Sequence, residues 1–203
     1  KLGLMKQLGD VILEQVCRDI SRFGKEGLKI KSVAINISSE QLFSVDLVEQ
    51  IKSNVSRHGI RFQNLELELV EELIAGDSSA LSRRLDIISS LGIELSIDDF
   101  GTGYSSLSRL KDLNVSKLKI DKSFVDGLPD SEHDICIVNS VIGLAKGMNL
   151  KLVAEGVETQ EQAKWLIENG CDYLQGYLLS KPIPVEQVKA FFAETHIPLI
   201  FSE

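Results

Sequence analysis

Cysteine and long apolar runs are scarce in this chain. Its 203 residues include only three cysteines, Cys17, Cys136 and Cys171, which lie far apart. Their odd number and their spacing fit neither a zinc site nor a disulfide framework, so we expect buried free thiols in a reducing cytoplasm. No apolar run is long enough to span a bilayer, and the start of the chain shows no signal-peptide pattern. We therefore expect no membrane segment in this chain.

Positive charge is also in deficit. The chain has 22 basic residues against 30 acidic ones, which gives a formal net charge of −8. We expect no duplex nucleic acid as a partner, because a surface that binds a duplex is basic. The three histidines, His58, His133 and His196, stand among polar residues, and we expect them at the surface without a metal role. A content of 43% hydrophobic residues can fill the core of one domain.

Apolar segments with strand-like and helix-like spacing alternate along the chain. Strands are predicted over residues 32–38, 65–71, 95–100, 117–121, 151–157 and 173–178. Helices are predicted over 4–23, with Leu8, Val11 and Ile12 on the apolar side, over 40–58, and between the later strands, with a last one from Pro184. This alternation is typical of a parallel sheet covered by helices. The predicted fold class is α/β, a TIM-like (β/α) barrel that lacks its first strand in this chain.

Two adjacent carboxylates, Asp98 and Asp99, end the third predicted strand and lead directly into a glycine-rich turn. Side chains alternate along a strand, so the two point to opposite faces unless a bend swings both toward one point. Two carboxylates at one point repel each other unless a cation lies between them, and carboxylate oxygens suit Mg²⁺, Mn²⁺ or Ca²⁺. By itself, a solvated turn explains the pair equally well.

Strand parity adds more polar groups to the inner face of the predicted barrel. The residues that lie late in successive strands on that face are Asn36, Glu68, Asp98, Lys119 and Glu155. They would form a ring at the C-terminal mouth, where such barrels keep their chemistry. The alternative is a structural polar plug, but burying unpaired charges costs several kcal/mol. The set suits two-metal phosphoryl chemistry, in which Lys119 orients the attacking water or stabilises negative charge.

The ordered motifs resemble those of the EAL domain, the family of phosphodiesterases that hydrolyse the bacterial second messenger cyclic di-GMP. They cover nearly the whole chain and are AINIS at 34–38, ELVE at 68–71, DDFGTGYSS at 98–106, LKID at 118–121 with FV at 124–125, AEGVET at 154–159, and QGY at 175–177 with KP at 181–182. The resemblance implies hydrolysis to linear pGpG by a two-metal mechanism with metal-activated water. It implies Mg²⁺ or Mn²⁺ as the cofactor.

The resemblance also implies a role for individual residues. The metal ligands would be Asn36, Glu68, Asp98, Asp99 and Glu155. The catalytic residues would be Lys119, Glu155 and Glu158, with Gln175 and Asp121 binding substrate. Glu71 would anchor the loop after Asp99, which in the family helps to form a homodimer. Upstream sensory or GGDEF domains are expected in the parent protein, which would be cytoplasmic or anchored to the inner membrane.

The chain departs from the family pattern in two places. Val70 replaces the usual threonine, and the Glu-Ala-Leu segment, whose Glu is a metal ligand, is expected upstream of Lys1. We interpret residues 1–203 as one EAL phosphodiesterase domain that is truncated at its N-terminus. Two alternatives stay open. One is a catalytically inactive EAL domain that acts as a cyclic di-GMP receptor and signals through a protein partner, and the other is a different metal-dependent barrel enzyme, such as an enolase-like lyase.

Overall fold

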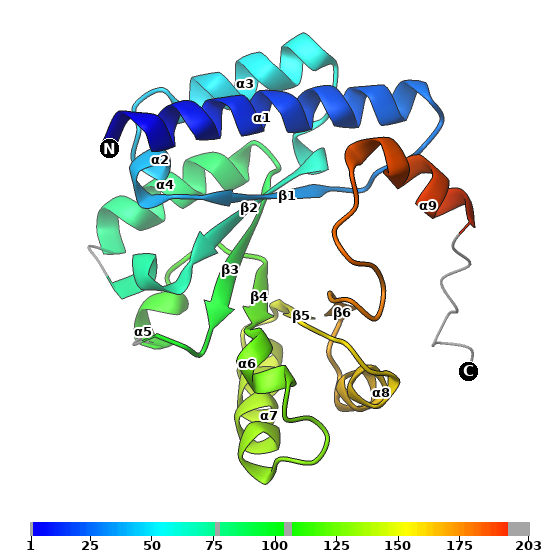
Figure 1. The fold of residues 1–203 in the computed structure, drawn as a ribbon. Coiled ribbons are helices and arrows are strands. Elements are labelled where there is room, and N and C mark those ends of the chain that lie inside the picture. The colour runs from blue at the N-terminus through cyan, green and yellow to red at the C-terminus, as the bar shows by residue number, and fades with distance from the viewer. Residues whose placement is uncertain (1, 76–77, 104–106, 195–203) are drawn as a thin grey trace. The chain divides into compact units, whose positions relative to one another are not determined.

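The computed structural model describes residues 2–75, 78–103 and 107–194, and in these residues strands and helices alternate (Figure 1). The chain divides into two compact units. The first is built from Lys1–Asp98 and Gly103–Ser116, and the second from Asp99–Thr102 and Lys117–Glu203. The prediction of a single domain over residues 1–203 stays a prediction.

The first unit carries three parallel strands, β1 (Val33–Ile37), β2 (Leu65–Val70) and most of β3 (Glu94–Phe100). Strand β2 is buried on both faces over residues 65–69, which include Glu66 and Glu68 as well as the leucines. The other elements of this unit are α1 (Leu2–Lys25), α2 (Ser39–Leu42), α3 (Leu47–His58), η1 (Phe62–Asn64), η2 (Glu71–Ala75), α4 (Ser78–Ser90) and α5 (Leu107–Leu110).

Helix α1 buries a different side from the one that its sequence suggests. Leu8, Val11 and Ile12 are exposed, whereas the core receives the longer stripe of Leu13, Cys17, Ile20 and Phe23. This stripe begins at Gly9, where any Cβ would overlap the side chain of Gln41. The missing side chain at Gly9 therefore lets α2 approach this side of the helix.

The predicted helix over 40–58 is two helices. Ser38 caps α2, since its hydroxyl accepts a hydrogen bond from the Gln41 amide and Gln41 Oε1 accepts one from the Ser38 amide. Phe43 ends this short helix, and α3 begins only after Asp46. The apolar spacing alone does not reveal the interruption, because α2 buries only Leu42 and the periodic burial lies in α3, at Leu47, Ile51 and Val55.

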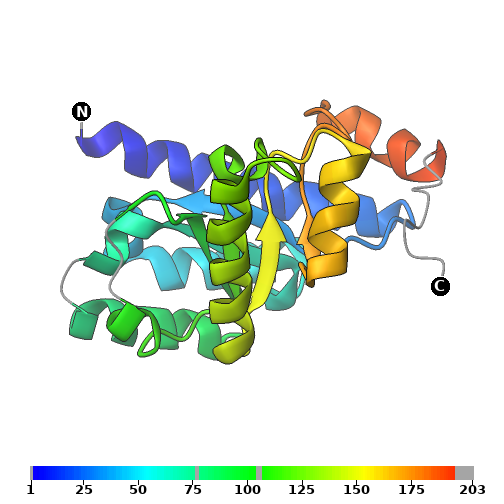
Figure 2. The ribbon, with the colours of Figure 1, turned by 90° about the horizontal axis from the view of Figure 1, so that it is seen from below.

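The second unit carries β4 (Lys117–Ile120), β5 (Lys151–Ala154) and β6 (Tyr173–Leu174), which are again parallel. Its helical elements are α6 (Lys122–Val125), α7 (Glu132–Gly147), α8 (Gln160–Asn169), η3 (Val185–Gln187) and α9 (Val188–Glu194). Helix α7 packs on β4 and β5, and Figure 2 shows β5 flanked by α7 and α8. Within each unit the strand order follows the chain order, β1-β2-β3 in the first and β4-β5-β6 in the second. The predicted parallel arrangement is therefore confirmed.

Two strands of the second unit are shorter than predicted. Strand β5 ends at Ala154, so Glu155 lies just beyond it, and β6 has only two residues. The chain nevertheless continues alongside, because the Val157 amide donates to Gln175 O at 3.0 Å. Gly176 permits this close approach, since a Cβ there would lie 2.1 Å from Val157 O.

The predicted environments of the thiols and imidazoles are partly wrong. Cys17 and Cys171 are shielded, and burial raises the pKa of each thiol to about 11. Cys136, however, is exposed, because it lies on the outer side of α7. His133 is exposed and His58 is half-buried, while His196 lies outside the described residues. In the part of the chain that the structure describes, none of the helices combines the length and the apolarity that a membrane span requires.

Candidate metal centre and adjoining pocket

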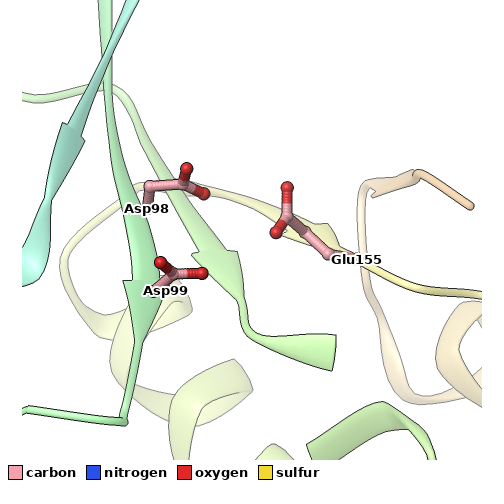
Figure 3. A group of neighbouring side chains, drawn as sticks. All are labelled: Asp98, Asp99 and Glu155. Carbon is pink, nitrogen blue, oxygen red and sulfur yellow. The ribbon is translucent and has the colours of Figure 1, made fainter. Parts of the chain in front are cut away.

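The end of β3 turns two neighbouring carboxylates toward one place. Asp99 has a φ of 53°, in the left-handed region, which aspartate tolerates better than most residues. This bend replaces the ordinary strand alternation, which would send Asp98 and Asp99 to opposite faces. Asp98, Asp99 and Glu155 each offer an oxygen, and the three oxygens lie within 4.8 Å of one another (Figure 3). The backbone at Asp99 thus has a bend of the kind that can bring both carboxylates to one point.

The donor set of this carboxylate cluster fits a hard divalent cation. Three negative groups so close together repel one another in the absence of positive charge. Carboxylate oxygens are the ligands that Mg²⁺, Mn²⁺ and Ca²⁺ prefer. Asp99 is exposed and Asp98 is 9% exposed, so the cluster joins a shielded carboxylate to one that reaches solvent. The residues present can therefore hold such an ion at an accessible position.

A buried ion pair orients one member of the cluster. Lys119 Nζ lies 2.6 Å from Glu155 Oε1, and the two side chains are 4% and 16% exposed. In the β4–β5 register Lys119 stands opposite Val153, so its side chain extends along the sheet to reach Glu155. At this distance the contact is a charge-assisted hydrogen bond. It fixes the carboxylate and supplies positive charge next to the cluster.

A second lysine–glutamate pair lies at the surface. Lys122, the first residue of α6, donates a hydrogen bond to Glu158 Oε1, and their side chains are 48% and 44% exposed. This hydrogen bond is the main reason that the pKa of Lys122 is raised. The Glu158 amide donates to Gln162 Oε1 at 2.8 Å, beside the Thr159 cap of α8. Both the backbone and the side chain of Glu158 are thereby held.

A pocket of about 580 Å³ opens beside these two pairs in the second unit. Glu155, Glu158 and Lys122 lie in one part of its wall, together with Gln175. The remaining wall is largely apolar and is formed by Tyr177, Pro182, Ile183, Val188, Phe191 and Phe192. An apolar pocket with a few convergent polar groups is the usual form of a small-molecule site.

The aromatic wall of this pocket was not predicted. Val188, Phe191 and Phe192 share a helical spacing, which indicates only an apolar helix face. The spacing does not reveal that this face of α9 borders the pocket of Glu155 and Glu158. Only the three-dimensional arrangement of the second unit brings these distant segments together.

The first unit holds four predicted site residues, namely Asn36, Glu68, Glu71 and Asp98. Asn36 and Glu68 are register partners on β1 and β2, with Glu68 buried and Asn36 exposed. In the β2–β3 register Glu68 pairs with Ser96, and Asp98 lies two residues further along β3. Glu68 and Asp98 therefore lie at different heights along the sheet, and the predicted ring of residues is staggered. Glu71 begins η2, and its Oε2 accepts a hydrogen bond from the Gly103 amide at 3.0 Å.

Asp121 has a structural task at its position. It is the N-cap of α6, and its Oδ1 accepts a hydrogen bond from the Ser123 amide at 3.0 Å. Its predicted role in binding substrate stays a prediction, as do the predicted roles of the other site residues. Tyr104, Ser105 and Ser106, the end of the DDFGTGYSS motif, lie outside the described residues.

Comparison with known proteins places this geometry in a family context. The family model of the EAL domain matches residues 1–182. The bifunctional diguanylate cyclase/cyclic di-GMP phosphodiesterase MucR of Pseudomonas aeruginosa is 40% identical over 95% of this chain and 28% of its own length. The cyclic di-GMP phosphodiesterase NbdA of the same organism is 38% identical over 93% of the chain and 24% of its own length. The chain thus spans about a quarter of the length of these relatives.

Solved structures agree with the fold. The chain matches the c-di-GMP complex of the PaMucR phosphodiesterase with a TM-score of 0.86 at 40% identity, covering 91% of this chain and 75% of that one. It matches the manganese and c-di-GMP complex of Klebsiella pneumoniae BlrP1 with a TM-score of 0.74 at 30% identity, covering 84% of this chain and 44% of that one. The likeness confirms the predicted α/β class, a TIM-like β/α barrel.

Proposed function

The chain belongs to the EAL domain family, as its motifs predict, and on that premise we propose that it hydrolyses cyclic di-GMP to linear pGpG. The observation that carries the proposal is the carboxylate cluster of Asp98, Asp99 and Glu155, with Lys119 bonded to Glu155. MucR and NbdA are named as cyclic di-GMP phosphodiesterases, which supports the same substrate here.

The proposed ligands of Mg²⁺ or Mn²⁺ are Asn36, Glu68, Asp98, Asp99 and Glu155. A pair of divalent cations supplies charge that acidifies a water and offsets the negative charge of the phosphate. The manganese complex of BlrP1 with c-di-GMP supports this choice of ion. Lys119 keeps Glu155 in one orientation and places an ammonium group where negative charge develops in the transition state.

The pocket offers a place for part of the substrate next to this chemistry. Cyclic di-GMP carries flat guanine bases, which stack well on aromatic side chains. Tyr177 and Phe192 are exposed at the pocket, and Lys181 Nζ lies 5.8 Å from the centre of the Tyr177 ring. We assign this wall to a guanine, with Gln175 available for hydrogen bonds to the base.

Assembly and location belong to the same proposal. The Glu71–Gly103 hydrogen bond ties the segment after Asp99 to η2, which supports the proposed role of Glu71 as a loop anchor. We propose a homodimer formed with the help of this segment, in a cytoplasmic part of the parent protein. MucR is named as a bifunctional diguanylate cyclase and phosphodiesterase, and this supports an upstream GGDEF domain in the parent protein.

The test is a cyclic di-GMP hydrolysis assay on the protein as encoded by its gene, with Mn²⁺ present. Wild type and Asp172→Asn should both release pGpG, because Asp172 pairs with Lys151 and lies outside the cluster. Asp99→Asn, the same isosteric change inside the cluster, should lose most activity. If wild type binds cyclic di-GMP without cleaving it, the protein is a cyclic di-GMP receptor and not a phosphodiesterase. Absence of both would favour a different metal-dependent barrel enzyme.

A further inference from the structure

Two lysine–glutamate pairs join the end of β4 to the segment that follows β5, and they have the same spacing. Lys119 bonds to Glu155, and Lys122, three residues later, bonds to Glu158, three residues after Glu155. Only the first pair follows directly from the proposed metal chemistry. The second pair lines the pocket, and its glutamate, Glu158, is a predicted catalytic residue, whereas no role has been predicted for Lys122.

Gly156 links the two pairs. Its φ is 67°, a conformation that side chains rarely adopt, and a Cβ at this position would lie 2.2 Å from Lys122 Cγ. The aliphatic stem of Lys122 therefore crosses the backbone directly between Glu155 and Glu158. A glycine at this position satisfies both the backbone conformation and the space that the lysine stem requires.

The contacts of Lys122 favour Glu158 as its partner. Its Nζ also lies 3.9 Å from Asp126 Oδ1, one turn along α6, but that is a longer ion pair. Glu158 enters the pocket wall from a backbone already held by Gln162. The remaining freedom of Glu158 is in its side chain, and the Lys122 hydrogen bond removes it.

We propose that Lys122 is a positioning residue, which holds the Glu158 carboxylate in place at the pocket and offsets its charge. This inference rests on the proposed function. Cyclic di-GMP is an anion, so an unpaired Glu158 would both rotate and repel the phosphates. Lys122 acts through Glu158 and does not itself touch the reacting atoms.

The kinetic test compares Lys122→Met with Lys122→Arg and with a matched control, Lys151→Met. Lys151 forms an exposed pair with Asp172 at 2.6 Å in the same unit and does not line the pocket. Lys122→Met should lower kcat about fivefold, as suits an exposed pair, and should raise KM, because the uncompensated Glu158 carboxylate repels the anionic substrate. Lys122→Arg should restore most of kcat, and Lys151→Met should leave both constants unchanged. A full kcat in Lys122→Met overturns the proposal.

A double-mutant cycle tests whether Lys122 acts through Glu158. In a Glu158→Gln background, Lys122→Met should cause no further loss of kcat, because the partner charge is already gone. If Lys122→Met still lowers kcat fivefold in the Glu158→Gln background, Lys122 does not act through Glu158.

A readout without activity separates this inference from the proposed function. Lysine side chains are labelled with acetic anhydride, and the rate at each lysine is followed by mass spectrometry. Glu158→Gln should speed labelling of Lys122 several-fold and leave Lys151 unchanged, whereas Asp172→Asn should affect only Lys151. If wild type leaves cyclic di-GMP intact, the proposed function fails and labelling decides alone. An unchanged rate at Lys122 in Glu158→Gln would then overturn the contact.

Discussion

The two lysine–glutamate pairs of the second unit have the same spacing but opposite environments. Lys119 and Glu155 are 4% and 16% exposed, whereas Lys122 and Glu158 are 48% and 44% exposed. Breaking a buried pair leaves a charge without solvent, while breaking an exposed one costs little. The same residue types therefore serve two purposes. We propose that the inner pair serves the metal chemistry, whereas the outer pair orients a side chain at the pocket.

The largest expected effect is on the inner pair. Lys119→Met should lower the free energy of unfolding by about 3–5 kcal/mol, because Glu155 loses its partner inside the protein. It should also lower kcat by on the order of a hundredfold or more. Urea unfolding and cyclic di-GMP kinetics measure the two effects. The double variant Lys119→Met/Glu155→Gln should regain stability but not activity. If Lys119→Met is as stable as wild type, the buried pair contributes no more to stability than the exposed one.

Mn²⁺ binding should depend on the carboxylate cluster, which contains Glu155 of the inner pair, and should not depend on the outer pair. At a hundredfold excess over its dissociation constant, a bound ion stabilises a fold by about 2.7 kcal/mol. Thermal unfolding with and without Mn²⁺ should show this stabilisation in wild type and in Lys122→Met. It should be absent in Asp99→Asn. Equal stabilisation of all three proteins would mean that Mn²⁺ binds elsewhere.

Gly156→Ala should show how closely the outer pair depends on the backbone between the glutamates. The left-handed conformation by itself costs an alanine about 1–2 kcal/mol, and the contact with Lys122 adds to it. Urea unfolding measures the loss. Gly27→Ala is the matched control, since Gly27 also has a positive φ but open space around it. An equal loss at both positions would show that the Lys122 stem contributes nothing.

The smallest effect is expected at the control pair of Lys151 and Asp172. Burial raises the pKa of Asp172, but the Lys151 hydrogen bond and the Leu152 amide outweigh it, so this pKa is lowered. The same hydrogen bond raises the pKa of Lys151. The stability that Asp172 contributes is present above its unfolded pKa and is lost as pH falls through its folded pKa.

Lys151→Met should therefore be only slightly less stable than wild type between pH 5 and 9. This difference should fade below about pH 4, where Asp172 takes up a proton. Urea unfolding across this pH range provides the measurement. A difference that grows toward acid pH would contradict the sign of the Asp172 shift.

Much of the fold follows from local patterns in the sequence. The alternating apolar residues of β2 and β4 and the short apolar stretch of β5 predict strands, since these patterns depend only on nearby residues. The break between α2 and α3 and the buried side of α1 do not follow. The buried side of α1 depends on the approach of Gly9 and Gln41, which come together only in the folded chain, and the apolar spacing carries no mark of the helix end at Phe43.

The candidate site divides in the same way. Asp98, Asp99, Lys119 and Glu155 are predictable, because each occupies a defined place at the end of a predicted strand. The Lys122–Glu158 pair and the pocket wall of Phe191 and Phe192 are not predictable. The pair forms only because Lys122 crosses the backbone at Gly156, and the wall forms only because α9 packs beside the pocket. Strand-end residues are constrained by the sheet, whereas pocket walls are built from segments far apart in the sequence.

The most direct measurement of the central claim is product analysis by mass spectrometry. The protein as encoded by its gene is incubated with cyclic di-GMP and Mn²⁺ in water enriched in ¹⁸O. We expect linear pGpG that carries one ¹⁸O atom on its new phosphate end, since water is the nucleophile. Cyclic di-GMP that stays intact under these conditions would contradict this expectation.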